Sequence, residues 1–151
     1  MKNNQQDRAV VTVRVIDAPR EVVFNAWADP KQLAQWWGPT GFTNTFHKFD
    51  FKPGGTWKVT MHSPDGKDFL NTSVFEIIEK PSRIVFKHLL PMHIFWLTAT
   101  FENIGHKTKL TFHQLFETAE ECERVKKFVE VANEQNLDRL EAVIIKNVIK
   151  K

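Results

Sequence analysis

The sequence predicts an α+β fold, in which a curved, seven-stranded antiparallel sheet wraps around one long C-terminal helix and two short helices follow the first strand. Three features predict it: strand-like runs separated by Pro and Gly, a change to helical spacing after the first run, and a long amphipathic stretch at the C-terminal end. The length of 151 residues is close to the common size of one domain. We therefore expect a single domain over residues 1–151, with a flexible N-terminus at residues 1–8.

The first strand and the first short helix are expected before residue 29. Residues 9–16 are rich in β-branched side chains, which favour a strand. The first helix opens at Ala18-Pro19, where Pro takes the first helical position. Helical spacing predicts one buried face, formed by Val22, Val23, Ala26 and Trp27.

The second short helix begins at Asp29, whose carboxylate can accept hydrogen bonds from the first turn. Gln32 can reach back as the far half of a capping box. The helix ends at the pair Trp36-Trp37, and Gly38-Pro39 stops it. Adjacent helical residues point about 100° apart, so only one of the two indoles can face the core fully. The other is expected at the lip of a cavity, either as a gate or as an anchor that ties the short helices to the sheet.

Six further strands are expected after Gly41. Clusters of Pro and Gly separate the runs, as tight turns require, and the short connections favour antiparallel pairing of neighbours. The runs are Phe42–Phe51, Thr56–His62, Phe69–Glu79, Ile84–Leu90, Ile94–Asn103 and Thr108–Phe116.

The last element is a long helix that begins near Thr118, because Thr118-Ala119-Glu120-Glu121 has the spacing of a capping box. Its apolar positions follow three-four spacing, which predicts a stripe buried against one face of the sheet. The stripe comprises Val125, Phe128, Val129, Ala132, Leu137, Leu140, Val143, Ile144 and Val148. A sheet that packs around such a helix is a helix-grip arrangement.

Several segments carry a family resemblance. They are Ala18–Trp27, Leu33–Pro39, Phe51–Trp57, Ser63–Gly66, Phe75–Ile77, Pro81–Phe86 and Leu137–Leu140. With these segments the chain resembles the START-like (SRPBCC) superfamily and, within it, the family named for the activator of the heat-shock protein 90 ATPase. The resemblance extends from about Val10 to Leu140.

The resemblance implies a deep apolar cavity between the sheet and the long helix, which members of the superfamily use to hold lipids, polyketides or other hydrophobic molecules. The chain departs from the pattern at one place. Relatives usually carry Gly-Trp before the Leu-Asp-Arg-Leu stretch, whereas this chain has Ala132-Asn133. The cavity wall has therefore lost an indole at this point.

Strand alternation and the helix stripe give a set of candidate ligand-binding residues. The set is Trp37, Trp57, Met61, Phe75, His88, Leu97, Phe112, Gln114, Phe128 and Ala132. His88 and Gln114 interrupt apolar strand faces. Each either orients a ligand through a polar contact or is a buried polar group that a neighbour or water satisfies. The loops Pro91-Met92-His93 and Pro64-Asp65-Gly66 are candidate entrances.

The usual marks of catalysis and metal binding are missing from the sequence. The six histidines show no metal-ligand spacing, and neither a phosphate-binding loop nor a Gly-x-Ser-x-Gly elbow is present. We therefore expect no metal, no cofactor and no catalytic residue. The single Cys122 stands among acidic residues, which raise the pKa of a thiol, and is expected to be unreactive.

The charge pattern and the hydropathy of the sequence argue against further classes of protein. Basic residues are interleaved with acidic ones, which argues against nucleic-acid binding. No apolar run approaches the roughly 20 residues of a membrane span, and the polar start lacks the apolar stretch of a signal peptide. We expect a cytoplasmic protein without membrane insertion.

The sequence favours a protein that binds a small hydrophobic molecule, as a monomer or weak homodimer, and favours a binding protein over an enzyme. Two alternatives stay open. One is a chaperone-associated protein-interaction module, after the name of the family. The other is a cyclase- or dehydratase-like enzyme that uses polar residues of the cavity, such as His88.

Overall fold

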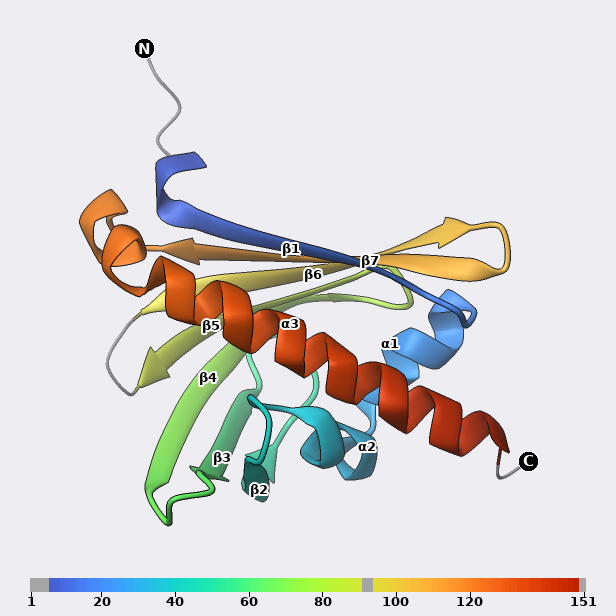
Figure 1. Cartoon of the computed structure of the whole chain (residues 1–151), viewed down its shortest axis with the longest axis horizontal. Helices are drawn as coiled ribbons and strands as arrows, with labels where there is room; N and C mark the ends of the chain where they lie inside the picture. The colour runs from blue at the N-terminus through green and yellow to red at the C-terminus, as the bar shows by residue number, and fades with distance from the viewer. Residues whose placement is uncertain (1–5, 91–93, 150–151) are drawn as a thin grey trace.

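The computed structural model describes residues 6–90 and 94–149, and in these residues the helices and strands follow the predicted order (Figure 1). The helices are the 3-10 helix η1 (Gln6–Arg8) and the α-helices α1 (Arg20–Ala28), α2 (Pro30–Trp36) and α3 (Ala119–Ile149). The strands are β1 (Ala9–Ile16), β2 (Thr43–Phe49), β3 (Thr56–His62), β4 (Asp68–Glu79), β5 (Arg83–Leu90), β6 (Phe95–Ile104) and β7 (Lys107–Phe116). The prediction of this α+β fold is confirmed.

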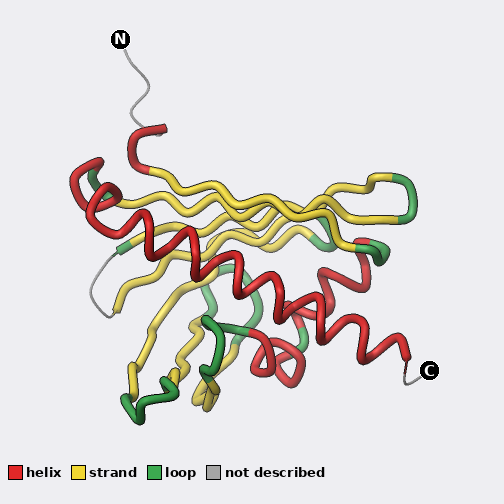
Figure 2. The backbone as a smooth tube through the Cα atoms, in the orientation of Figure 1, coloured by secondary structure: helices red, strands yellow, loops and turns green. Residues whose placement is uncertain are grey.

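The strands form one antiparallel sheet in the order β1-β7-β6-β5-β4-β3-β2. Register shifts occur in the β2–β3 pair and twice in the β4–β5 pair. Such bulges bend a strand and increase its local twist. In Figures 1 and 2, β4, β3 and β2 accordingly turn away from the plane of β1, β7 and β6, and the sheet curves around α3.

The Gly-Gly turn before β3 forms backbone hydrogen bonds to β4 beside the register shift between Phe75 and Ile77. Gly54 donates its backbone N–H to the carbonyl of Phe75 at 2.7 Å, and Phe75 donates to the carbonyl of Gly55 at 2.9 Å. A Cβ atom on Gly55 would lie 1.9 Å from the carbonyl oxygen of Asp50. This approach admits only glycine, so the turn can stay bonded to the backbone of Phe75 on β4.

The two short helices differ from prediction in three details. α1 begins at Arg20, because Pro19 has the extended backbone of an N-cap residue rather than the first helical position. Val22 is exposed, and the buried face consists of Val23, Phe24, Ala26 and Trp27. Asp29 caps α2 by accepting from the N–H of Lys31, but Gln32 donates to the side chain of Asp29 and not to its backbone, so the capping box is incomplete.

Helix α3 begins as predicted, with the hydroxyl of Thr118 accepting from the N–H of Glu121 at 3.1 Å. Its C-terminal half joins the main core, where Leu137, Leu140, Val143 and Ile144 pack with residues of α1, α2 and the sheet. Its N-terminal end joins a second, small core with Val10, Phe116, Cys122 and Val129. Phe128 belongs to neither cluster and is 70% exposed, which corrects its placement in the buried stripe. The predicted burial of Val148 lies outside the side chains that the structure describes.

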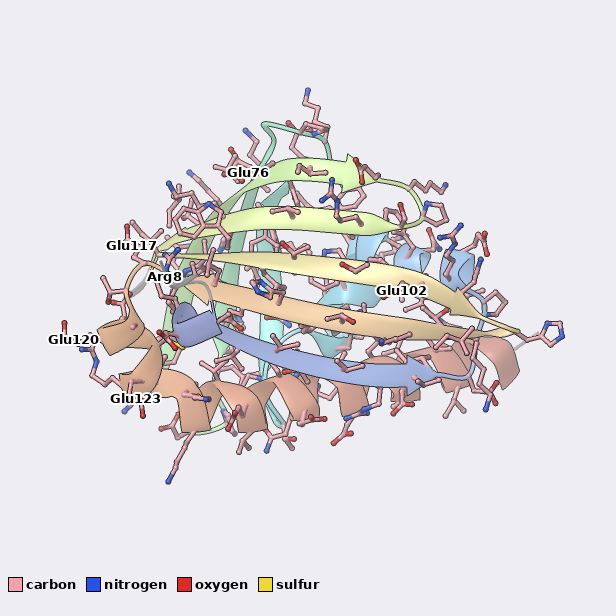
Figure 3. The ribbon with its side chains drawn as sticks, turned by 90° about the horizontal axis from the view of Figure 1, so that it is seen from above. Arg8, Glu76, Glu102, Glu117, Glu120 and Glu123 are labelled. Atoms are coloured by element: carbon pink, nitrogen blue, oxygen red, sulfur yellow. The ribbon has the colours of Figure 1, made fainter. Side chains whose placement is uncertain are left out.

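The start of the chain is tied to the end of β7. Of the N-terminus predicted to be flexible, residues 1–5 lie outside the described residues, and Gln6–Arg8 form η1. Arg8 donates to the carbonyls of Phe116 and Glu117 at 3.0 and 3.1 Å, beside the first turn of α3 (Figure 3). None of the described helices has the length and apolar character needed to span a membrane.

Candidate functional site

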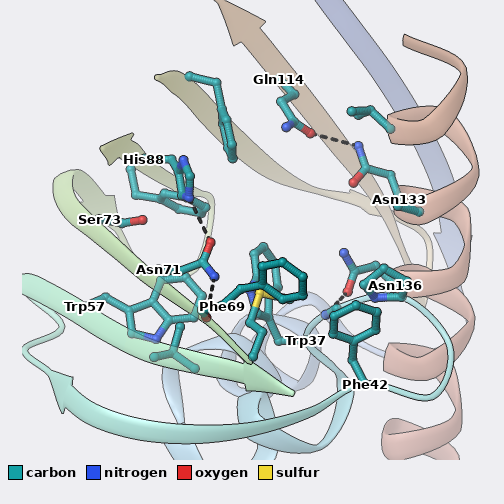
Figure 4. A pocket seen from close by; sticks show the side chains of 18 of the residues that line it. Trp37, Phe42, Trp57, Phe69, Asn71, Ser73, His88, Gln114, Asn133 and Asn136 are labelled. Atoms are coloured by element: carbon teal, nitrogen blue, oxygen red, sulfur yellow. Dashed lines mark hydrogen bonds between the residues drawn. The ribbon is translucent and has the colours of Figure 1, made fainter. Parts of the chain in front are cut away.

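A cavity of about 410 Å³ lies between the concave face of the sheet and the N-terminal half of α3 (Figure 4). Its walls come from the end of α2 and the following loop, from strands β3 to β7, and from α3. The lining residues are Trp37, Gly38, Pro39, Phe42, Trp57, Val59, Met61, Phe69, Asn71, Ser73, Phe86, His88, Phe95, Gln114, Phe128, Val129, Ala132, Asn133 and Asn136. No Asp, Glu, Lys or Arg is among these described residues.

The cavity exists because the buried stripe of α3 changes character in its middle. Apolar side chains occupy the stripe at both ends, with Leu137, Leu140, Val143 and Ile144 in the main core and Cys122 and Val129 in the second core. Between them the residues that face the sheet are Ala132, Asn133 and Asn136. These side chains are too short to reach across to β3, β4 and β5, so the space between helix and sheet stays open.

The adjacent indoles of Trp36 and Trp37 separate in the way the sequence predicts. Trp36 is fully buried, and its Nε1–H donates to the carbonyl of Ala26 at 3.0 Å. Trp37 is only partly buried and lines the cavity, with its ring centroid 5.2 Å from that of Trp57. Trp36 therefore anchors α2, and Trp37 forms part of the aromatic wall.

The loop that follows α2 forms one rim of the cavity, and α3 holds it through polar side chains. The guanidinium of Arg139 donates to five backbone carbonyls, of Gln35, Trp37, Gly38, Pro39 and Phe42, at 2.8–3.1 Å. Burial lowers the pKa of this guanidinium. Asn136 Oδ1 accepts from the N–H of Gly38 at 2.7 Å, inside the same loop. The rim is thus fixed by hydrogen bonds to charged and amide groups, which are among the stronger ones in proteins.

Gly38 is needed at this rim because of its backbone and its surroundings. Its φ is +99°, and a Cβ atom would lie 2.9 Å from Cε of Met61 and 3.1 Å from Cβ of Phe42. Both neighbours line the cavity. A larger residue at position 38 would therefore strain the backbone and push into the cavity wall.

His88 lies in the cavity wall on β5, where its neighbours include Asn71 and Phe95. Its Nε2 lies 2.8 Å from Oδ1 of Asn71, and its ring stacks on Phe95 with centroids 4.5 Å apart. Asn71 in turn donates to the carbonyl of Phe69 at 3.1 Å. These contacts fix the ring of His88 against the wall, and its role toward a ligand or a substrate stays a prediction.

Gln114 on β7 faces the cavity opposite α3. Its Oε1 accepts from Nδ2 of Asn133 at 3.1 Å, and both side chains are buried (Figure 4). The two polar residues that the sequence singled out, His88 and Gln114, are thus each bonded to a neighbour while also lining the cavity.

The structure brings seven of the ten candidate ligand-binding residues together in the cavity wall: Trp37, Trp57, Met61, His88, Gln114, Phe128 and Ala132. Phe75, Leu97 and Phe112 are buried in the main core and are not part of the lining, which corrects their placement. Phe75 stacks behind Trp57, with parallel rings 6.0 Å apart, and Phe112 packs edge-to-face on Trp27. For Phe75, the larger ring of Trp57 thus takes the place in the cavity wall.

Phe128 marks the side on which the cavity meets solvent, because it lines the cavity and is nevertheless 70% exposed. Of the two candidate entrance loops, Pro91–His93 lies outside the described residues. Pro64 lies beside Gly41, and the loop Pro64-Asp65-Gly66 contributes no lining residue.

Sequence reasoning missed the polar lining residues Asn71, Ser73 and Asn136, and it placed Asn133 at the wall only as the site of a lost indole and not as a polar contact. Two signals could have found them. Asn133 and Asn136 occupy positions in the apolar stripe of α3, four and seven residues after Val129. Asn71 and Ser73 share a face of β4 with Phe69, by the period of two in a strand.

The outer face of the sheet carries a separate polar group. Nε2 of His62 lies 2.7 Å from the hydroxyl of Thr45, and its Nδ1 lies 2.7 Å from the carboxylate of Asp68. The side chains of His62 and Asp68 are 34% and 65% exposed, so the group is open to water. We interpret it as cross-strand pairing between β2, β3 and β4. Glu76 on β4 also points outward and is exposed (Figure 3).

The reactive groups of the described residues give no sign of a metal centre. Within residues 6–90 and 94–149, no three His, Cys, Asp or Glu side chains gather in a way that could hold a metal ion. Cys122 is 2% exposed, and burial raises the pKa of its thiol, with Glu123 and Glu130 adding to the rise. The direction agrees with the sequence prediction, but burial and not the acidic neighbours is the main cause.

Comparison with protein families identifies the relatives of this fold. The family model described as "Activator of Hsp90 ATPase homolog 1-like protein" matches residues 17–144. The chain belongs to this family. The match spans α1 to the C-terminal half of α3 and therefore includes every cavity-lining residue. No curated protein matches the chain.

Solved structures of similar proteins share the fold of this chain. A protein from Nitrosomonas europaea has a TM-score of 0.87 at 16% identity, with 95% of this chain and 97% of that chain covered. A protein from Arthrobacter aurescens has a TM-score of 0.87 at 24% identity, with 96% and 90% covered. The AHSA1 protein from Silicibacter pomeroyi has a TM-score of 0.74 at 19% identity, with 92% and 99% covered. At these identities the likeness concerns the fold alone.

Proposed function

We propose that this protein binds a small, largely apolar molecule in the cavity between the sheet and α3, as a monomer or weak homodimer in the cytoplasm. The observation that carries the proposal is the cavity itself, at about 410 Å³ and with a mostly apolar and aromatic lining. Ligand sites of small molecules are commonly of this kind, with volumes of roughly 300–1,000 Å³ and a few placed polar groups. The fit of Trp37, Trp57 and Phe86 around the space supports an occupant with a flat or aliphatic body.

The lining also indicates the charge of the occupant. An ionised group in an apolar site costs free energy unless an opposite charge pairs with it. No Asp, Glu, Lys or Arg is among the described lining residues, and the one titratable side chain among them, His88, is already bonded to Asn71. The expected ligand is therefore neutral.

The first experiment is native mass spectrometry of freshly purified protein, followed by denaturing extraction of any bound molecule. A neutral apolar compound carried through purification would support the proposal and give the ligand class. A charged, strongly hydrophilic compound would contradict it.

A second experiment uses the neutral fluorescent probe N-phenyl-1-naphthylamine, whose emission rises in apolar surroundings. Ala132→Phe should fill the space and weaken probe binding about tenfold or more, because Ala132 lines the cavity. Val131→Phe is the matched control, since Val131 is the next residue of α3 and is 58% exposed on another face. Equal probe affinity in the two variants would exclude this cavity as the site. Thermal unfolding of both variants checks that the fold is kept.

The chaperone-associated alternative rests on the name of the family. It predicts that the chain co-purifies with a chaperone of its own host. Loss of that complex in a surface variant, with probe binding unchanged, would move the function away from the cavity.

A further inference from the structure

The amides of Gln114 and Asn133 form a pair that connects the sheet to α3 across the cavity wall. Gln114 comes from β7 and Asn133 from the middle of α3, and the bond from Asn133 Nδ2 to Gln114 Oε1 measures 3.1 Å. The side chains are 8% and 7% exposed. Figure 4 shows the two amides side by side, facing the space that Trp37 and Trp57 enclose.

This pair keeps hydrogen-bonding capacity that residues 6–90 and 94–149 do not use. A carboxamide carries two N–H donors and one carbonyl oxygen. Within the described part of the chain, Gln114 Nε2 and Asn133 Oδ1 make no hydrogen bond of their own. They are also not among the polar atoms there that are sealed from solvent without a partner, which are on Arg20, Trp27, Asn44 and Trp57. The pair therefore offers the cavity an unused NH2 group and an unused carbonyl oxygen.

The presence of an unused donor and an unused acceptor does not depend on which way the two amides are oriented. The oxygen and nitrogen of a carboxamide are assigned from the hydrogen-bond network. If both amides are turned over, Gln114 donates to Asn133, and one N–H group and one carbonyl oxygen still face the cavity. A donor beside an acceptor is thus a property of the pair.

The other amide side chains of the lining form hydrogen bonds to residues of the cavity wall. Asn71 binds His88 through its oxygen and the carbonyl of Phe69 through its nitrogen. Asn136 uses its oxygen for the N–H of Gly38. Among the described lining amides, the Gln114–Asn133 pair alone combines an unused donor with an unused acceptor.

We propose that the Gln114–Asn133 pair selects ligands whose apolar body carries a neutral group that both accepts and donates hydrogen bonds, such as an amide, a lactam or a hydroxyl. This inference rests on the proposed function of the cavity. A site built to pair with such a group discriminates against an analogue that lacks it, because the buried amides then lose their partners. A carboxylate of the same shape brings a charge that the cavity does not neutralise.

The test uses three probes of nearly the same shape: 2-naphthamide, 2-isopropenylnaphthalene and 2-naphthoate. The first carries the donor and acceptor, the second replaces them with carbon, and the third replaces them with an anion. We expect 2-naphthamide to bind about tenfold or more tightly than either of the others, as two net hydrogen bonds imply. Titrations followed by NMR of the side-chain amides give the affinities and report directly on Gln114 and Asn133.

The variant for this test is the double substitution Gln114→Leu with Asn133→Leu. It removes both partners and replaces them with apolar side chains, so neither amide is left unpaired. We expect the preference for 2-naphthamide to disappear while 2-isopropenylnaphthalene binds as well as before or better. The probe series on the unaltered protein needs no variant, so the inference is tested even if the double variant does not fold.

The outcomes separate this inference from the proposed function. Equal binding of 2-naphthamide and 2-isopropenylnaphthalene would overturn the role of the pair and leave the cavity as an apolar site. Binding of none of the three probes would overturn the proposed function together with the inference. A preference for 2-naphthamide that survives the double substitution would place recognition elsewhere in the wall.

Discussion

The two halves of α3 face the same sheet but do different things. In the C-terminal half, Leu137, Leu140, Val143 and Ile144 are at most 7% exposed and fill the space down to α1, α2 and β1. In the N-terminal half, the facing positions hold Ala132 and Asn133, and a cavity remains. The C-terminal half forms part of the main core, and the N-terminal half leaves a cavity open beside the second, small core. Two or three positions in the stripe of a helix thus decide whether the helix and the sheet pack into a core or leave a cavity between them.

The strongest test of this comparison uses the adjacent indoles of Trp36 and Trp37. Trp36 lies in the main core, and Trp37 lines the cavity. Trp36→Ala should destabilise the fold by about 3–5 kcal/mol, because it empties a fully buried site and removes the bond to Ala26. Trp37→Ala should cost less, about 1–3 kcal/mol, because Trp37 is only partly buried. Urea unfolding measures both. Trp37→Ala should be the variant that changes binding of N-phenyl-1-naphthylamine.

If Trp37→Ala cost as much as Trp36→Ala, the cavity wall would be as important for stability as the core, and the division of α3 into two halves would fail. The m-value of each variant serves as a control, since an unchanged m-value shows that only stability has changed.

A second prediction concerns the contact between the two halves. Arg139, in the packed half of α3, donates to five backbone carbonyls. One belongs to the last turn of α2, and four belong to the rim loop beside the cavity. Arg139→Met should cost about 1.5–3 kcal/mol, the scale of hydrogen bonds to a charged group. Hydrogen exchange at residues 37–42 should rise more than exchange in β6 and β7, because the loop loses its support first.

Arg139→Lys is the matched variant for this prediction. Lys keeps the charge but cannot direct donors to five carbonyls at once, so it should recover only part of the stability. Full recovery by Lys would show that the charge alone matters and that the fork of hydrogen bonds does not.

The contrast also explains which parts could be predicted from the sequence. The strands were found because alternation and turn residues are local, and the capping box of Thr118 is local as well. Trp36 and Trp37 could be separated in principle, because helical geometry allows only one of them to face the core. The lining was harder. Phe75, Leu97 and Phe112 share inward faces with true lining residues, and only the depth of neighbouring rings places them behind the wall.

The hydrogen bonds of the lining amides Asn133 and Asn136 were missed for a related reason. Asn133 and Asn136 look like a weak point of an amphipathic helix when the stripe is scored for apolar residues. Their role appears only when β7 and the rim loop are brought to the helix, since their partners Gln114 and Gly38 are distant in sequence. Long-range pairing of polar groups has no local pattern, so sequence reasoning could not supply it.

A third prediction concerns the surface attachment of α3 to β1. Arg14 on β1 contacts Glu134, Asp138 and Glu141 at 2.8, 3.0 and 2.6 Å. Burial alone would lower the pKa of Arg14, but its hydrogen bonds to these carboxylates raise it overall, so the guanidinium stays charged. Arg14→Met should cost only about 1 kcal/mol, since the carboxylates are partly exposed. The loss should shrink at high salt. A salt-independent loss would assign the effect to packing.

The smallest expected effect concerns Cys122, at the N-terminal end of α3, where the open half is closed by the second core. Burial raises the pKa of this thiol in the folded state. The contribution of the buried thiol to stability is therefore present below the ordinary thiol pKa of about 8.5 and is lost as the pH rises through the higher folded value. Cys122→Ala should lack this decline, which urea unfolding from pH 7 to 10 measures. Iodoacetamide should react slowly with the native protein at pH 7.5 and quickly after unfolding. Fast reaction of the native protein would show that this end of α3 opens readily, and that the cavity half of the helix is held mainly from its C-terminal side.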